Sequence, residues 1–176
     1  MKLIAALGNP GKQYESTRHN AGWIVLDEIC KKLNFADFSE NSKFKVLACE
    51  GSLHGEKTFF IKPQEFMNKS GHAIKNFLDF YKIPFENLTI IHDDLDIDLG
   101  KYKISTDSSA GGHNGVQSII DVFGTQKFQR IRIGIEGSEN KKLRTTAGDV
   151  FVLQNFSKEE LDTIKKLADQ ITEKIS

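Results

Sequence analysis

Short apolar runs alternate with segments of helical periodicity along the chain, and this alternation constrains the fold more than any other feature. The strand-like runs lie at residues 2–7, 44–53, 58–62, 88–92, 101–104 and 130–135. Apolar residues at helical spacing mark residues 21–33, 73–81 and 115–123 and a last segment that Ser157 and Glu160 open as a capping box. The alternation predicts the α/β class: a three-layer α/β/α sandwich around a mixed, mostly parallel twisted sheet.

The length and composition suit one globular domain. A chain of 176 residues can bury a sizeable core, and we expect a single domain over residues 1–176. The sequence shows neither a signal peptide nor a run long enough to span a membrane. Its two cysteines, Cys30 and Cys49, lack a metal-binding spacing, and Cys30 lies on an apolar helix face. We therefore expect a reduced, cytoplasmic location, no membrane contact and a core role for Cys30.

The charge is balanced overall but uneven along the chain. Lys and Arg together number 24, as do Asp and Glu, which argues against a protein that coats nucleic acid nonspecifically. Residues 101–145 nevertheless hold eight Lys or Arg against four Asp or Glu. A local basic face suits a discrete anionic partner, although a solvated surface with clustering by chance stays open.

Polar segments follow four of the predicted strands. Asn9 follows the first, and residues 66–68 follow the run at 58–62. The sequence HDD (92–94) ends another strand, and AGGHNG (110–115) follows the basic strand. In α/β folds, ligands bind outside the carboxyl ends of the strands. We therefore expect these four segments to meet at one rim of the sheet.

Familiar phosphate and metal templates fail on these segments. In LGNPGKQYESTRHNAGW (7–23), Gln13 stands where a P-loop that begins at Gly8 needs glycine, and Pro10 stands where a dinucleotide-binding loop needs it. In IHDDLDIDLG, an EF-hand loop fails because Leu99 occupies the position of its glycine. We expect neither a metal nor a cofactor, with a metal site at HDD (92–94) as the open alternative.

His19 is the best candidate for a catalytic base. It precedes a predicted helix, whose positive end should lower the pKa of the imidazole, and an Asp on its other nitrogen would fix the tautomer. The amides of Asn9, Asn68 and Asn114 could donate to a developing oxyanion or accept from peptide N–H groups. No serine-hydrolase motif occurs, so water is the expected nucleophile. A purely structural His19 stays open.

Five motifs together resemble a known family. The sequences GNPGKQYESTRHNAG, FMNKSG, HDDLD, GGHNG and RIRIGI occur in the order and spacing of bacterial peptidyl-tRNA hydrolase, and the similarity extends over nearly the whole chain. The resemblance implies an esterase that releases peptides from tRNA after aborted translation. It also implies a single α/β/α globule that is usually monomeric, with tRNA as its partner and without an obligate protein partner.

The resemblance also implies roles for individual residues. His19 matches the family's base, Asp93 the residue that holds it, and Asn9 the residue that distinguishes blocked from free aminoacyl groups. The positions that contact the peptidyl and 3′-terminal parts of the substrate are matched by Tyr14, Phe66, Asn68 and Asn114. Chemically, the Asn9 oxygen could accept the neutral N–H of an acylated nitrogen, whereas a protonated amine would need desolvation. His113 is expected to be a structural or rim contact.

The phosphate-binding residues are less sharply indicated. Arg132 is the best candidate for a clamp on a tRNA phosphate, because a guanidinium can donate two parallel hydrogen bonds. Its partner is Lys103 or Lys101, since Ser105 stands where relatives often have a basic residue. The sequences STDSSAGGHNG and EGSENKK also depart from the family pattern, at the rim and at the expected lid over the site.

Two other functions stay open at this point. One is an RNA-binding module on the same fold that has lost hydrolysis, which the complete set of His19, Asp93 and Asn9 disfavours. The other is a hydrolase of small N-acyl esters, which intact tRNA would not inhibit.

Overall fold

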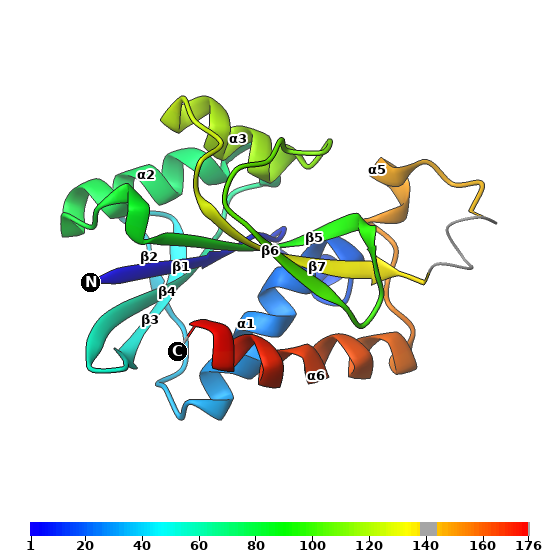
Figure 1. Cartoon of the computed structure of the whole chain (residues 1–176), viewed down its shortest axis with the longest axis horizontal. Helices are drawn as coiled ribbons and strands as arrows, with labels where there is room; N and C mark the ends of the chain where they lie inside the picture. Colours follow the sequence, from blue (N-terminus) through cyan, green and yellow to red (C-terminus); the bar gives the residue numbers. More distant parts are fainter. Residues whose placement is uncertain (138–143, 176) are drawn as a thin grey trace.

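A seven-stranded sheet lies at the centre of the computed structural model, which describes residues 1–137 and 144–175 (Figure 1). The strands are β1 (Lys2–Ala6), β2 (Ser39–Asn41), β3 (Val46–Leu53), β4 (Glu56–Pro63), β5 (Leu88–Asp98), β6 (Tyr102–Ser105) and β7 (Gln129–Glu136). The helices are α1 (Ala21–Lys32), α2 (Ser70–Tyr81), α3 (Asn114–Phe123), α5 (Gly148–Phe151) and α6 (Lys158–Ile175). Short 3₁₀ turns occupy Lys12–Tyr14, Arg18–Asn20, Met67–Lys69 and Phe85–Asn87. Most of EGSENKK lies outside the described residues.

The sheet is parallel at its centre and antiparallel at its edges. Its strand order is β2-β3-β4-β1-β5-β7-β6, and β4, β1, β5 and β7 are parallel neighbours. The pairs β2-β3, β3-β4 and β6-β7 are antiparallel, so only β3 and β6 oppose the other described strands. The predicted mixed, mostly parallel sheet is confirmed.

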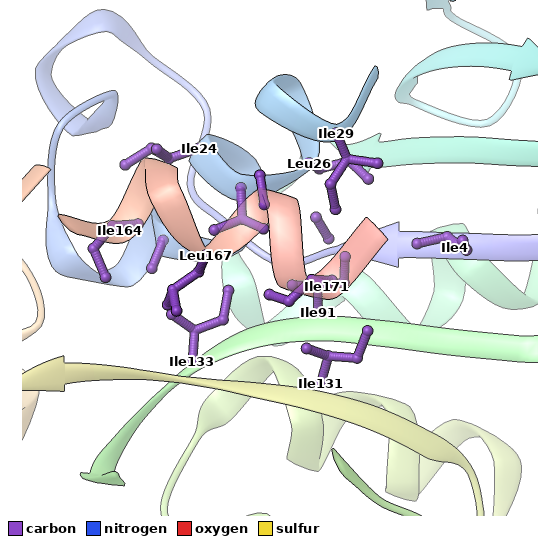
Figure 2. Packing of buried hydrophobic residues seen from close by; sticks show 14 of the residues in the cluster. Ile4, Ile24, Leu26, Ile29, Ile91, Ile131, Ile133, Ile164, Leu167 and Ile171 are labelled. Atoms are coloured by element: carbon purple, nitrogen blue, oxygen red, sulfur yellow. The ribbon is translucent and has the colours of Figure 1, made fainter. Parts of the chain in front are cut away.

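Helices cover both faces of this sheet, which gives the predicted three layers. The helices α1 and α6 lie on one face, and α2 and α3 lie on the other (Figure 1). On the first face, Ile164, Leu167 and Ile171 of α6 pack with α1 over Ile91 and Ile133 of the sheet (Figure 2). Burial of both faces explains why the central strands read as continuous apolar runs.

The helix α1 touches the backbone of β5 and of the residue that follows β1. A Cβ atom on Gly22 would lie 2.6 Å from the carbonyl oxygen of Ile91 and 2.9 Å from that of Leu7. Glycine therefore permits an approach that any other residue would block. This contact places the turn before α1, which carries His19, beside the end of β1 and the middle of β5, where Asp93 lies.

Two features of the fold bear directly on the sequence analysis. The capping box at α6 is confirmed, because the Ser157 N–H donates to the Glu160 carboxylate (2.7 Å) and the Glu160 N–H donates to Ser157 Oγ (3.2 Å). The strand β5, in contrast, continues beyond the predicted end at residue 92, because β7 pairs with it as far as Asp98. Asp93 therefore lies within a strand and not in the loop after it.

In the described part of the chain, no helix combines the length and the apolar character needed to cross a membrane.

Candidate active site

An open pocket of about 670 Å³ gathers the four polar segments at one end of the sheet. The predicted site residues that line it are Asn9, His19, Phe66, Asn68, Asp93 and Asn114. Tyr14 and Arg132 do not line it. Tyr14 lies beside it, with its ring edge-on to Phe66 at a centroid distance of 6.4 Å. Asn9 and residues 66–68 follow the parallel strands β1 and β4, as expected. AGGHNG reaches the pocket differently, because β6 is antiparallel to β7 and ends at the opposite end of the sheet, so the loop after β6 returns to the pocket.

The backbone around His19 is held by the segment before α6. The His19 N–H donates to the carbonyl oxygen of Val152 (2.7 Å). The neighbouring Arg18 guanidinium donates to the carboxylate of Glu160 (3.0 Å) and to the carbonyl oxygen of Asn155 (2.6 Å). Because these contacts fix the turn on both sides, the His19 ring enters the pocket in one orientation.

Asp93 bridges two histidines. Both of its carboxylate oxygens lie 2.9 Å from His19 Nδ1, and Oδ1 lies 2.8 Å from His113 Nε2. The other nitrogen of His113, Nδ1, accepts hydrogen bonds from the backbone N–H groups of Gly115 (3.1 Å) and Val116 (3.3 Å) at the start of α3. The ring of His113 therefore carries its proton on Nε2 and donates it to Asp93.

These contacts set the protonation of the centre. Burial raises the pKa of Asp93, but the charges and hydrogen bonds of His19 and His113 outweigh it and hold that pKa far below its usual value. Burial also lowers the pKa of His19, yet the Asp93 charge and hydrogen bond prevail, so the pKa of His19 is raised above 6.5. The lowering expected from the helix start is wrong, because the adjacent carboxylate dominates.

A neutral His19 has a defined proton arrangement. Its Nδ1–H donates to Asp93, which leaves Nε2 as the acceptor for a proton from the pocket. The carboxylate also stabilises the imidazolium that forms when Nε2 takes up that proton. The pair is therefore prepared for general-base chemistry.

Asn9 offers the pocket a donor. Its side-chain Oδ1 already accepts from the backbone N–H of Met67 (3.3 Å), and its backbone is paired with the Asn20 side chain at 2.8 and 3.0 Å. The Asn9 Nδ2 group is thus left for a ligand. The sequence indicates the Asn9 oxygen as the group that meets the substrate, and the hydrogen bond from Met67 leaves Nδ2 as the less committed group.

The side chains suited to binding a metal differ from the set that the sequence left open. In the described residues, His19, Asp93 and His113 bring ligand atoms within 4.8 Å of one another. A metal on His113 Nε2 would displace the proton that its role at the start of α3 requires, so the donor set does not fit an ion well. His92 donates through Nδ1 to its neighbour's carbonyl (2.7 Å), and burial first, then His113, lowers the pKa of His92 to about 3.

The basic edge of the sheet lies beside the pocket. Arg132 Nε donates to Asp94 Oδ2 (2.8 Å), and Asp94 lines the pocket. The register of β6 and β7 places Lys103 directly opposite Arg132. Lys101 instead lies 3.7 Å from the carboxylate of Asp98. Of the two candidates, Lys103 is therefore the better placed beside Arg132.

Residues around α5 form a wall of the pocket that the sequence did not predict. This wall contains Arg144, Gly148, Asp149, Val152 and Leu153. The helix α5 is too short to show a periodic apolar pattern, and its residue types carry no motif. Only their place in the fold identifies them.

Comparison with known proteins agrees with this geometry. Residues 3–176 match the family model described as peptidyl-tRNA hydrolase. A peptidyl-tRNA hydrolase of Thermoanaerobacter sp. (strain X514) is 48% identical over 170 residues, which cover 97% of this chain and 86% of that protein. One from Bacillus anthracis is 44% identical, covering 98% of this chain and 92% of that protein. The crystal structure of peptidyl-tRNA hydrolase from Acinetobacter baumannii has 31% identity and a TM-score of 0.86, covering 99% of this chain and 86% of that one.

A histidine–carboxylate pair in an α/β pocket rich in amide side chains, together with these relatives, defines a carboxylic-ester hydrolase. The chain belongs to the peptidyl-tRNA hydrolase family. It hydrolyses the ester bond between peptide and tRNA in peptidyl-tRNA, as the five motifs predicted.

Proposed function

We propose that His19 is the general base of this hydrolysis. Asp93 orients the imidazole ring and stabilises its protonated form. The observation that carries the proposal is the contact of both Asp93 oxygens with His19 Nδ1 at 2.9 Å, in a pocket that His19 lines. Because Nδ1 is occupied, Nε2 is the nitrogen that meets the substrate water. Asp93 does not touch the water and acts through the ring.

In the proposed reaction, His19 Nε2 removes a proton from water as the water oxygen attacks the ester carbonyl carbon. The negative charge on the tetrahedral intermediate is stabilised by amide N–H donors, for which Asn9, Asn68 and Asn114 are the candidates. The imidazolium then gives its proton to the 3′ oxygen of the tRNA ribose as the C–O bond breaks. The products are a peptide with a free carboxylate and a tRNA with a free hydroxyl.

Asn9 is the proposed discriminator between blocked and free aminoacyl groups. Its oxygen is held by Met67, so Nδ2 can donate to the carbonyl oxygen of an N-acylated substrate. A protonated α-amine has no acceptor for that donor, and its charge must also lose water to enter the pocket. One neutral donor can therefore select blocked substrates whatever their side chains.

Tyr14 and Phe66 are proposed to contact the peptidyl or 3′-terminal part of the substrate. Phe66 is 58% exposed and lines the pocket, and Tyr14 supports it edge-on. An exposed aromatic ring at a pocket mouth suits contact with a base or an apolar side chain.

Arg132 and Lys103 are the proposed clamp for a phosphate near the acceptor end of tRNA. Asp94 holds Arg132 through Nε, which leaves the guanidinium's outer edge for a phosphate, and Lys103 adds a cation across the strand pair. We further propose one domain over residues 1–176, a cytoplasmic location where its substrate arises, and action as a monomer without an obligate protein partner.

Release of labelled peptide from N-acetylaminoacyl-tRNA tests the proposal. His19→Ala should lower kcat roughly 10³-fold or more, because the variant lacks the proposed base. The exposed His72 of α2 provides a matched control, and His72→Ala should leave kcat unchanged. Substantial turnover by a folded, tRNA-binding His19→Ala variant would remove His19 from this role.

A further inference from the structure

The two cysteines lie together on the side of the sheet covered by α1, although neither touches the catalytic pocket. Cys30 of α1 and Cys49 of β3 are both free thiols, and their sulfur atoms are 3.7 Å apart. A disulfide needs a separation of about 2.05 Å, so the sulfurs have only about 1.7 Å to close. Their nineteen-residue separation in sequence gave no sign of this contact.

The surroundings favour one thiol as the nucleophile. The hydrogen bond with Cys30 lowers the pKa of Cys49 against the effect of burial, and the Lys62 ammonium lowers it further. The same hydrogen bond, with burial, raises the pKa of Cys30. Lys62 is itself nearly buried and is fixed by Asp27 at 2.6 Å. Cys49 is thus the cysteine that more readily forms a thiolate and attacks an oxidant, and Cys30 is the cysteine that then closes the disulfide.

Cys49 lies near the edge of the sheet. In the described residues, the pairing of β3 with the edge strand β2 ends at Ala48, so β3 has no further strand on its outer side from Cys49 onward. Cys49 is 7% exposed, and its side chain faces α1 together with Cys30. Contact between the sulfurs and the position of Cys49 near the sheet edge are independent observations, and together they favour a redox-active pair.

We infer that Cys30 and Cys49 form a reversible disulfide when the protein meets a peroxide, and that this bond fastens α1 to β3. The Cys49 thiolate attacks one peroxide oxygen, the O–O bond breaks, and a sulfenic acid and water result after uptake of a proton. The Cys30 sulfur then attacks the Cys49 sulfur, the S–O bond breaks, and a second water leaves. The two thiols together lose two electrons, and hydrogen peroxide takes them up and is reduced to two water molecules.

The bond closes the loop between residues 30 and 49, which contains β2. Closing a loop of this size restricts the unfolded chain, so the oxidised protein should melt roughly 5 °C higher than the reduced one. The bond lies near the last turn of α1, whereas His19 precedes its first turn. Peptidyl-tRNA hydrolysis should therefore change less than about twofold.

The experiment exposes the reduced full-length protein to hydrogen peroxide, alkylates the remaining thiols in denaturant and maps the peptides by mass spectrometry. We expect a Cys30–Cys49 peptide pair that is lighter by two hydrogens, reversal by dithiothreitol and the higher Tm. Oxidation in concentrated urea should be slower, because unfolding separates the thiols. In Cys30→Ala, Cys49 should stop at a sulfenic acid that dimedone captures.

The wild-type map decides the inference even where the variant folds poorly. If both cysteines are alkylated after peroxide treatment, no disulfide has formed. The inference would then be wrong, and the two cysteines would serve only to pack the core. A Cys49 sulfinic acid beside an alkylated Cys30 would also overturn it, as would a cross-link that forms no faster in the folded protein than in urea. A cross-link without a rise in Tm would overturn the fastening of α1 to β3.

Discussion

The buried group of His19, Asp93 and His113 and the basic edge of the sheet are neighbours with different structures. At the centre, His19, Asp93 and His113 are buried, and each hydrogen bond fixes where the next proton lies. At the edge, Lys103 and Arg132 face each other across two strands in contact with solvent, and the ion pair with Asp94 restrains Arg132. The first arrangement suits chemistry, which needs protons in fixed places. The second suits capture of a phosphate, which needs accessible charge.

This difference predicts which kinetic constants respond to change. Changes among the buried groups alter proton positions and should affect kcat. Changes at the edge alter attraction to a polyanion in water, which salt screens, and should affect KM and its salt dependence. Asp94 joins the two regions, because it lines the pocket and holds Arg132.

Asp93→Asn should lower kcat roughly 10² to 10³-fold, less than the loss of His19 but more than any change at the basic edge. His113 is fixed as a donor by its place at the start of α3, so it should take the amide oxygen of the new side chain. The amide NH₂ then donates to His19 Nδ1, so the proton of His19 lies on Nε2. In this tautomer Nε2 cannot accept a proton from water. Turnover of N-acetylaminoacyl-tRNA at saturation measures this loss, with Asp94→Asn as the control that should alter KM instead.

The pH profile of the same variant provides a second reading. The carboxylate raises the pKa of His19, so the rate of the wild type should rise with pH through a value above 6.5. Removing the negative charge favours the neutral ring and should move this limb of the profile to lower pH. If the rate of the variant rises with pH at the same value as in the wild type, Asp93 does not act through His19.

His113→Asn should rescue part of this loss, by about tenfold, when it is combined with Asp93→Asn. An asparagine can still cap α3, but it is too short to reach residue 93 and brings no fixed donor there. The amide at 93 can then turn its oxygen toward His19 Nδ1 and restore the useful tautomer. The measurement is a double-mutant cycle on kcat, and a double variant slower than Asp93→Asn alone would contradict the proton arrangement.

Asn9→Asp should reduce the preference for blocked over free aminoacyl-tRNA by about tenfold. The carboxylate can still accept from the Met67 N–H, so the loop keeps its support. It has lost the donor for an acyl carbonyl, however, and now attracts a protonated amine. The ratio of kcat/KM for the two substrates measures this, and an equal fall on both would make Asn9 a general positioning residue.

Arg132→Ala should have the smallest effect, a roughly threefold to tenfold rise in KM for peptidyl-tRNA. The slope of log KM against log salt should fall by about one for the lost phosphate contact. A minimal peptidyl ester without tRNA phosphates should be hydrolysed as before. Lys103→Ala should behave alike, and Lys101→Ala, whose side chain pairs with Asp98, should not. Equal losses on the minimal ester would assign Arg132 to the catalytic centre or the fold.

The sequence predicted most of the fold because the central elements bury regular apolar patterns. β2 escaped prediction because SEN is polar and lies at an exposed edge, and α5 because four residues cannot show a helical period. The length of β5 depends on its pairing with β7, about forty residues away, and no local pattern carries that information.

Within the site, the motifs predicted which residue types meet but not how their protons are arranged. The role of His113 depends on two backbone N–H groups that orient its ring, and the free group of Asn9 depends on the backbone of Met67. The proton positions of His113 and Asn9 therefore depend on where the backbone N–H groups lie, and the sequence alone does not give those positions. The pairing of Arg132 with Asp94 likewise joins residues on different strands.

Gly22 carries a consequence for how freely this sequence can vary. Its hydrogen atom is all that fits between α1 and the carbonyl oxygens of Leu7 and Ile91. Any larger side chain lifts the first turn of α1, and with it the His19 ring from Asp93. Gly22 has no functional group, yet the backbone atoms around it leave no room for another residue. Its identity is restricted by the shape of the site and not by reactivity.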